Sequence, residues 1–155
     1  MIADRRLREI HQMLWARIAA DGIILRAHIR LGSIDAETQG EFFINKLGEP
    51  QIHVYRTHHS ERVDDYEQEL VTLAHEYGHA ISHKRRERPR EEMPEASPDL
   101  TLEGKQAIQD EEARAWQYGR EALLDLGLTD FAAFEKWKAE ADAIYLRRLG
   151  LGGVW

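Results

Sequence analysis

The chain is organised around the segment Leu70-Val71-Thr72-Leu73-Ala74-His75-Glu76-Tyr77-Gly78-His79-Ala80-Ile81. This segment contains the pattern H-E-x-x-H, which is short and therefore needs support from the rest of the chain. On a helix, His75 and His79 lie one turn apart on the same face, so both imidazoles can reach a single metal ion. Glu76 would point to one side of them, towards a water molecule bound to that ion.

The neighbouring sequence predicts that this segment belongs to a long helix. Asp64 followed by Glu67 resembles a capping box, so we expect a helix over residues 65–86. On a helical wheel His75 and His79 project from the side opposite the apolar stripe, where a core histidine would not lie. This placement favours metal binding. The apolar stripe consists of Leu70 and of residues within about 60° of it on the wheel, namely Leu73, Ala74, Tyr77 and Ile81.

Length and composition limit the classes of protein to consider. A chain of 155 residues with 43% hydrophobic residues can form one ordinary core, so we expect residues 1–155 to be a single domain. The formal charge of −7 argues against nucleic-acid binding. Because the chain has no cysteine, a transition metal would need imidazole and carboxylate ligands. Neither a signal peptide nor a membrane span is evident, so we expect a cytoplasmic protein with no membrane partner.

The remaining hydrophobic patterns predict an α+β fold. Residues 7–20 have helical periodicity and are followed by the stop signal Asp21-Gly22. Residues 24–31 alternate between apolar and polar side chains, as in a half-buried strand. Two shorter strands are expected at 41–44 and 51–55, joined as a hairpin. We therefore expect a small three-stranded sheet packed against about four helices, with H-E-x-x-H on a central helix.

A third metal ligand is expected on a helix from Leu102 to Leu126. Glu112 falls inside the apolar face of this helix, and a carboxylate there must be paired or bound to metal. Glu111 lies on the flank of that face and is the alternative ligand. An ordinary helix in which Arg114 or Arg120 neutralises these acids is the other interpretation. Ala115 and Gly119 are small and would allow this helix to approach the H-E-x-x-H helix closely.

Other segments are less informative about chemistry. His83 lies about 12 Å along the helix from His75, which is too far to share one ion. His58 and His59 are expected in a loop, where neighbouring side chains point in opposite directions. A charged connector with three prolines spans residues 84–99. Thr129 is expected to cap a last helix that ends near Leu149.

On these residues the chain resembles the gluzincin metallopeptidases, and among them the ImmA/IrrE family. The resemblance covers roughly residues 20 to 125 and is carried by short strands, by residues 73–81 and by Glu112-Ala113-Arg114-Ala115-Trp116. It implies Zn²⁺ held by His75, His79 and Glu112, with Glu76 as the general base. Members of this family are bacterial or phage-borne proteases, some of which cleave a repressor or an antitoxin.

The sequence also departs from the usual pattern of that family. Arg114, Trp116 and Gln117 replace an asparagine, a phenylalanine and an alanine. Trp116 also stands where some gluzincins have an acid that orients a zinc-bound histidine.

The expected function is hydrolysis of peptide bonds in a protein substrate by a zinc metallopeptidase. Glu76 would be the base, and His58, His59 or Tyr145 could supply a second donor to the oxyanion. The alternative is a metal-bound regulatory or interaction module that binds a partner without cutting it.

Overall fold

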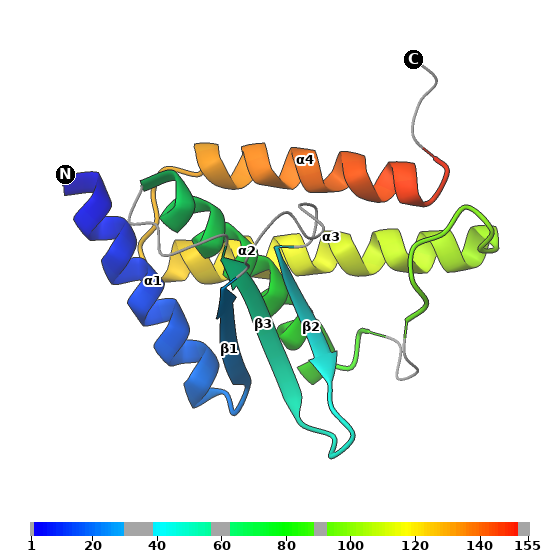
Figure 1. The fold of residues 1–155 in the computed structure, drawn as a ribbon, viewed down its shortest axis with the longest axis horizontal. Helices are drawn as coiled ribbons and strands as arrows, with labels where there is room; N and C mark the ends of the chain where they lie inside the picture. The colour runs from blue at the N-terminus through cyan, green and yellow to red at the C-terminus, as the bar shows by residue number, and fades with distance from the viewer. Residues whose placement is uncertain (1, 30–38, 57–62, 89–92, 152–155) are drawn as a thin grey trace.

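The computed structural model describes residues 2–29, 39–56, 63–88 and 93–151. Within these residues it contains four helices and one three-stranded mixed sheet, which confirms the α+β expectation. The sheet lies on one side of helix α2, and helices α3 and α4 lie on the other side (Figure 1). In chain order the elements are α1 (Ile2–Ala20), β1 (Ile24–Ile29), β2 (Gly40–Ile44), β3 (Pro50–Arg56), α2 (Val63–Lys84), α3 (Leu102–Asp125) and α4 (Ala132–Arg148).

The sheet has the order β1-β3-β2, with β1 parallel to β3 and β2 antiparallel to it. The expected hairpin between β2 and β3 is present. Its turn is held by the side-chain oxygen of Asn45, which accepts hydrogen bonds from the backbone N–H groups of Leu47 and Glu49. The central strand contributes Ile52 and Val54 to the core. This topology leaves β2 as an edge strand beside α2.

The first helix and strand follow the expected pattern with one difference. Three residues of the expected apolar stripe of α1 are fully buried, namely Ile10, Leu14 and Ile18. The helix stops at Asp21-Gly22, where Gly22 has a φ of 78°. Ala27 was expected on the buried face of β1 but is exposed. β1 is an edge strand, and burial is greatest at Ile23, just before the strand, and decreases along it.

Helix α2 is buried on more than one side. It begins at Val63 rather than near Asp65, and it ends at Lys84, about two residues earlier than expected. Most of its expected apolar stripe is buried, as Leu73 and Ala74 show, while Ile81 is half-buried. The opposite side is also buried because α3 packs along it. The histidines of the motif therefore face an interface between helices and not open solvent.

Small residues bring the backbones of α2 and α3 into contact, as Ala115 and Gly119 led us to expect. A Cβ atom added to Gly78 would lie 1.9 Å from the carbonyl oxygen of Ala115. A Cβ atom added to Gly119 would lie 2.5 Å from the carbonyl oxygen of Ala74. Neither position can hold a larger side chain unless the backbones separate. The two contacts fix the distance between the helices next to Glu112.

The last two helices are close to their expected limits. Helix α3 starts at Leu102, and the side chain of its N-cap Thr101 accepts a hydrogen bond from the backbone N–H of Gly104. The cap expected at Thr129 is wrong, because α4 starts later, at Ala132. Its first N–H is instead satisfied by Asp130, whose carboxylate accepts a hydrogen bond from it. The N-cap residue itself is Phe131, which makes no side-chain capping bond, and Asp130 precedes it in an Asx turn.

Outside these elements, residues 93–99 of the connector are not helical, as expected. In the part of the chain that the structure describes, no helix is long and apolar enough to cross a membrane.

The contact at Gly78 can be tested by a single substitution. Gly78→Ala should lower the free energy of unfolding by about 2 to 3 kcal/mol, because its methyl group would meet rigid backbone. Gly104→Ala is the matched control in the first turn of α3. There the nearest atom to the new Cβ would be 3.3 Å away, on the side chain of Thr101. This control should be neutral or stabilise by up to about 1 kcal/mol. Equal effects of the two variants in urea denaturation would contradict the close contact.

Candidate metal centre

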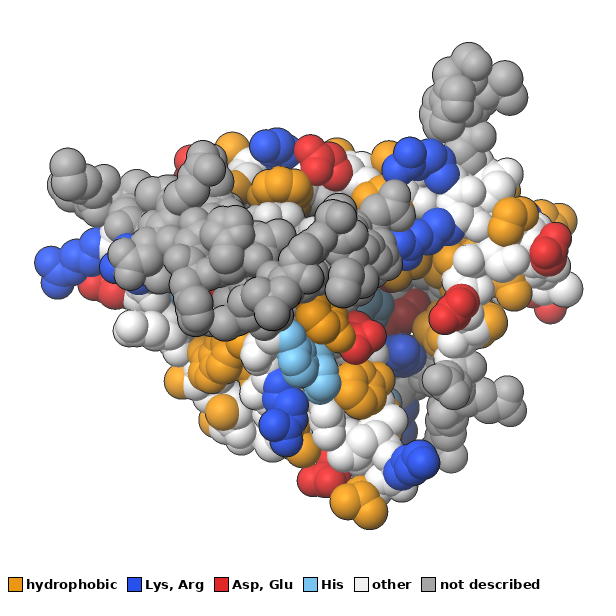
Figure 2. All heavy atoms as spheres, viewed as in Figure 1, with side chains coloured by type: hydrophobic (Ala, Val, Ile, Leu, Met, Phe, Trp, Pro, Cys, Tyr) orange, Lys and Arg blue, Asp and Glu red, His pale blue; other side chains and the backbone are white. Residues whose placement is uncertain are grey.

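Three side chains from two helices converge between α2 and α3. Helix α2 supplies His75 and His79, and helix α3 supplies Glu112. One potential ligand atom from each residue lies within 4.8 Å of the other two. The Oε2 atom of Glu112 is 2.9 Å from Nε2 of His75 and 3.5 Å from Nε2 of His79. Histidine and acidic side chains are visible in a hollow on the face shown in Figure 2.

The bonding of these atoms fits a metal site better than an ordinary ion pair. Glu112 Oε2 is buried and close to two imidazole nitrogens, but its geometry with the described residues is not that of a regular hydrogen bond. The Nδ1 atom of His75 is also buried, and it has no hydrogen-bond partner among the described residues. Buried polar atoms are normally satisfied, so such an arrangement needs an explanation. A cation held between the three residues would satisfy the carboxylate oxygen.

Glu111 holds His79 in position from the side away from Glu112. The Nδ1–H of His79 donates a hydrogen bond to Glu111 Oε2 over 2.6 Å, which leaves Nε2 free as a ligand. Ser82 donates to the other oxygen of Glu111, also over 2.6 Å. Arg114 donates a third hydrogen bond over 3.3 Å. Glu111 was expected as an alternative ligand, but the structure places it on the opposite ring nitrogen of His79.

Aromatic rings support the two histidines. The ring of Trp116 stacks on His75 with a centroid distance of 4.1 Å and an interplanar angle of 30°. Phe42 of β2 stacks more distantly on His79, at 6.5 Å. Trp116 is in turn packed edge-on against Phe134 of α4. His75 is therefore held by packing, whereas His79 is held by hydrogen bonding.

Glu76 is buried beside the converging residues, with 7% of its surface exposed. Burial raises the pKa of its carboxyl group, and this effect outweighs the lowering by His75 and His79. The first residue of β2, Gly40, lies close to it, since a Cβ added there would be 3.3 Å from Glu76 Cγ. The absence of a side chain at Gly40 therefore leaves room for the carboxylate between β2 and α2.

The charges of the site stabilise one another. Burial opposes ionisation of Glu112, but the imidazoles of His75 and His79 are stronger influences together and lower its pKa well below the usual value. Burial likewise opposes the charge on His79, but Glu112 and the hydrogen bond with Glu111 raise its pKa to about 10. In the absence of a metal ion, protonated His79 supplies the positive charge that the carboxylates need.

Of the other candidates from the sequence, Tyr145 lies in the site. Burial raises its pKa, and so do the charge of Glu112 and a hydrogen bond with that residue. His58 and His59 lie outside the described residues. His83 does not join the ligand group, as expected, and is exposed at the end of α2.

Two supporting residues were not recognised from the sequence. Glu111 was considered only as a ligand or as part of an ordinary ion pair, and Trp116 only as a departure from a family pattern. The position of Glu111 next to Glu112 was a usable signal. An acid one residue before a ligand lies about 100° around the helix, so it can reach the other ring nitrogen of His79.

No protein-family model, curated protein or solved structure matches this chain. Its interpretation therefore depends on the residues and geometry described above.

The role of Glu111 predicts how strongly the site binds metal. Glu111→Gln should weaken Zn²⁺ binding by about 10- to 100-fold, because an amide oxygen is a poorer acceptor for the His79 N–H. Asp110→Asn is the matched control, since Asp110 is the exposed neighbouring acid and accepts a hydrogen bond from the side-chain amide of Gln106. Competition titrations with a chromophoric chelator give both affinities. Equal affinity of the two variants would show that Glu111 does not orient His79.

Proposed function

We propose that this chain is a zinc-dependent metallopeptidase that hydrolyses peptide bonds in a protein substrate. The strongest support is that two kinds of residue occur together. His75, His79 and Glu112 could hold a metal ion, and Glu76 is a buried acid outside this ligand group. Two imidazoles and one carboxylate are typical of catalytic zinc, which keeps a further position for water. Calcium and magnesium prefer sites built mainly from oxygen ligands.

The mechanism assigns separate roles to the metal and to Glu76. Zinc bound by the three residues would lower the pKa of a coordinated water and polarise the peptide carbonyl. Glu76 accepts a proton from the water while the water oxygen bonds to the carbonyl carbon. It then delivers that proton to the peptide nitrogen as the C–N bond breaks, which yields a carboxylic acid and an amine. The raised pKa of Glu76 makes it a stronger base for the first transfer.

Tyr145 is the candidate for the second oxyanion donor. Its hydroxyl group lies beside Glu112, and its raised pKa keeps it protonated at neutral pH. A protonated hydroxyl can donate a hydrogen bond to the oxygen that becomes negative in the transition state. Because Tyr145 comes from α4, this helix would complete a site that α2 and α3 begin.

The resemblance to the ImmA/IrrE family favours a bacterial or phage cytoplasmic protein as the substrate, such as a repressor or an antitoxin. That choice is part of the proposal and follows from the resemblance in residues 73–81 and around Glu112 alone.

Substitution of Glu76 separates metal binding from hydrolysis. We expect about one zinc ion per chain by elemental analysis. Glu76→Gln should retain the zinc and lose at least about 100-fold in cleavage rate, because it removes the base without removing a ligand. Glu121→Gln, an exposed change on α3, is the control and should match the parent. Zinc binding without cleavage by the parent would favour the alternative of a regulatory or interaction module. A chain that takes up no zinc would contradict the site itself.

A second substitution tests the oxyanion donor. Tyr145→Phe should reduce kcat by about 10- to 1,000-fold at unchanged zinc content, because it removes one hydrogen-bond donor. Tyr118→Phe is the matched control, since the Tyr118 hydroxyl donates instead to Glu87. If both variants cleaved peptides at the parent rate, the donor would have to be sought elsewhere.

A further inference from the structure

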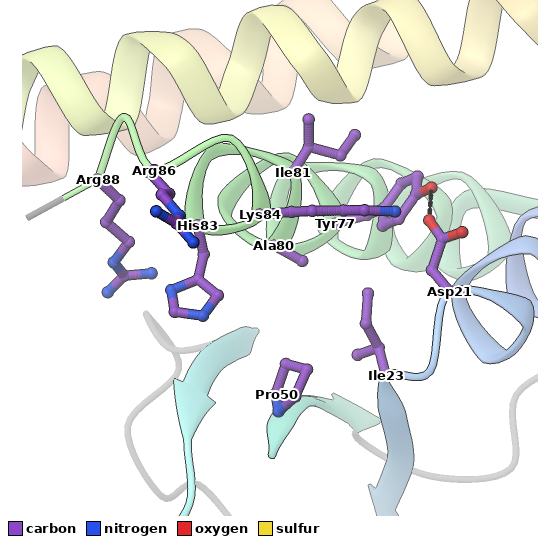
Figure 3. A pocket seen from close by; sticks show the side chains of 10 residues that line it. All are labelled: Asp21, Ile23, Pro50, Tyr77, Ala80, Ile81, His83, Lys84, Arg86 and Arg88. Atoms are coloured by element: carbon purple, nitrogen blue, oxygen red, sulfur yellow. Dashed lines mark hydrogen bonds between the residues drawn. The ribbon is translucent and has the colours of Figure 1, made fainter. Parts of the chain in front are cut away.

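A pocket with a volume of about 660 Å³ lies between the C-terminal half of α2 with the residues after it, the turn before β1 and the start of β3. Part of its lining is apolar and includes Ile23, Pro50 and Ala80. Figure 3 shows His83, Arg86 and Arg88 gathered at one end, with the hydrogen-bonded pair of Asp21 and Tyr77 at the other. The remaining lining residues are Ile81 and Lys84.

No residue in the described part of the chain forms an ion pair with the lysine or the arginines of this pocket. These cations are Lys84, Arg86 and Arg88. The single acid of the lining, Asp21, accepts the hydrogen bond of Tyr77 at the far end. The chain as a whole carries a formal charge of −7, so acids that could neutralise these cations are abundant. Unpaired cations around a concave surface favour the binding of an anion.

Arg88 extends from this pocket towards the metal centre. Its guanidinium lies 5.0 Å from the ring centroid of Phe42, and that ring stacks on His79. Its Nη1 atom is buried and has no hydrogen-bond partner among the described residues. A buried guanidinium N–H without an acceptor is a specific position for an incoming oxygen.

Arg86 has a backbone conformation that would favour glycine. It follows α2 with a φ of 59°, and its N–H bonds to the carbonyl of His83. The N–H of Glu87 bonds to the carbonyl of Ser82, which completes a Schellman motif. Glycine is the usual residue at this position because a Cβ atom is unfavourable there. Residues held in such conformations often have a functional role, and the side chain of Arg86 lines the pocket.

We propose that this pocket binds a carboxylate group of the peptide substrate close to the bond that is cut. This inference rests on the proposed peptidase function and adds a substrate preference to it. Arginine can bind a carboxylate through two parallel hydrogen bonds. The apolar lining can accommodate the methylene groups or neighbouring residues that carry the carboxylate. The carboxylate comes from an acidic side chain or from the C-terminus of the peptide.

The first experiment identifies cleavage sites in a pool of peptides made from a whole-cell proteome. The zinc-loaded parent should favour Asp or Glu at one fixed position near the scissile bond, or cut at a fixed distance from the C-terminus. Amidation of the C-termini distinguishes these two sources, because it abolishes only the second preference. A parent that cuts efficiently with neither preference would overturn the inference and leave the peptidase proposal intact.

Charge-removing variants test whether the pocket causes the preference. Arg88→Gln should raise KM about tenfold for the favoured peptides and leave kcat little changed, because it removes a charge-assisted contact. Arg86→Gly should also weaken the preference while raising Tm by several degrees, since it relieves the positive φ. Arg85→Gln is the control, because Arg85 stacks on Tyr118 and does not line the pocket. An unchanged preference in both pocket variants would contradict this assignment.

A second experiment does not depend on cleavage. Sulfate is titrated into the full-length ¹⁵N-labelled protein at constant ionic strength. Saturable shifts in the amide signals of residues 83–88 should occur in the parent and in Arg85→Gln but be much weaker in Arg88→Gln. Sulfate binding by a parent that cuts nothing would support the anion pocket and count against the peptidase. The parent protein could instead bind sulfate saturably and cleave peptides with no preference for a nearby carboxylate. That result would overturn the assignment to a substrate carboxylate.

Discussion

The backbone contact between α2 and α3 is the constraint on which the rest of the structure depends. Gly78 faces Ala115, and Gly119 faces Ala74, so each helix contributes an alanine and a glycine four residues apart. The contact is reciprocal because the two helices run antiparallel. No side chain separates the backbones at these points. The ligand residues lie on the adjoining turns, and their separation is therefore fixed mainly by backbone packing.

This contact also explains why the centre can contain so many buried ionisable groups. Burial by itself raises the pKa values of Glu76, Glu111 and Glu112 and so disfavours their charged forms. Close packing instead brings His79 between two of these carboxylates, where a raised pKa maintains its charge. Without a metal ion the histidine acts as the counter-ion. If zinc binds, the ion supplies this positive charge, and His79 must lose the proton on Nε2. The hydrogen bond from its Nδ1–H to Glu111 can persist.

The sequence was informative wherever a feature depends only on which residues share one face of a single helix. The spacing of His75 and His79, the acid in the apolar face of α3 and the small residues at Ala115 and Gly119 all belong to this class. The roles of Glu111, Trp116 and Tyr145 depend on how far one helix is rotated against another, which no local pattern records. The start of α4 was misplaced for a different reason, because its N-cap residue is Phe131, which capping preferences do not identify. Metal binding and hydrolysis stay predictions.

The glycine contacts have a further consequence for the choice of metal. A site on long, flexible loops can change its shape and recruit additional oxygen atoms around a larger ion. Here the helices cannot move apart or slide without breaking the contacts at Gly78 and Gly119. Calcium needs about six to eight oxygen ligands, and magnesium demands near-octahedral geometry. If the site binds a metal, as we propose, a stiff frame with three donors would discriminate against both ions through its rigidity, in addition to the chemical preference of its imidazoles.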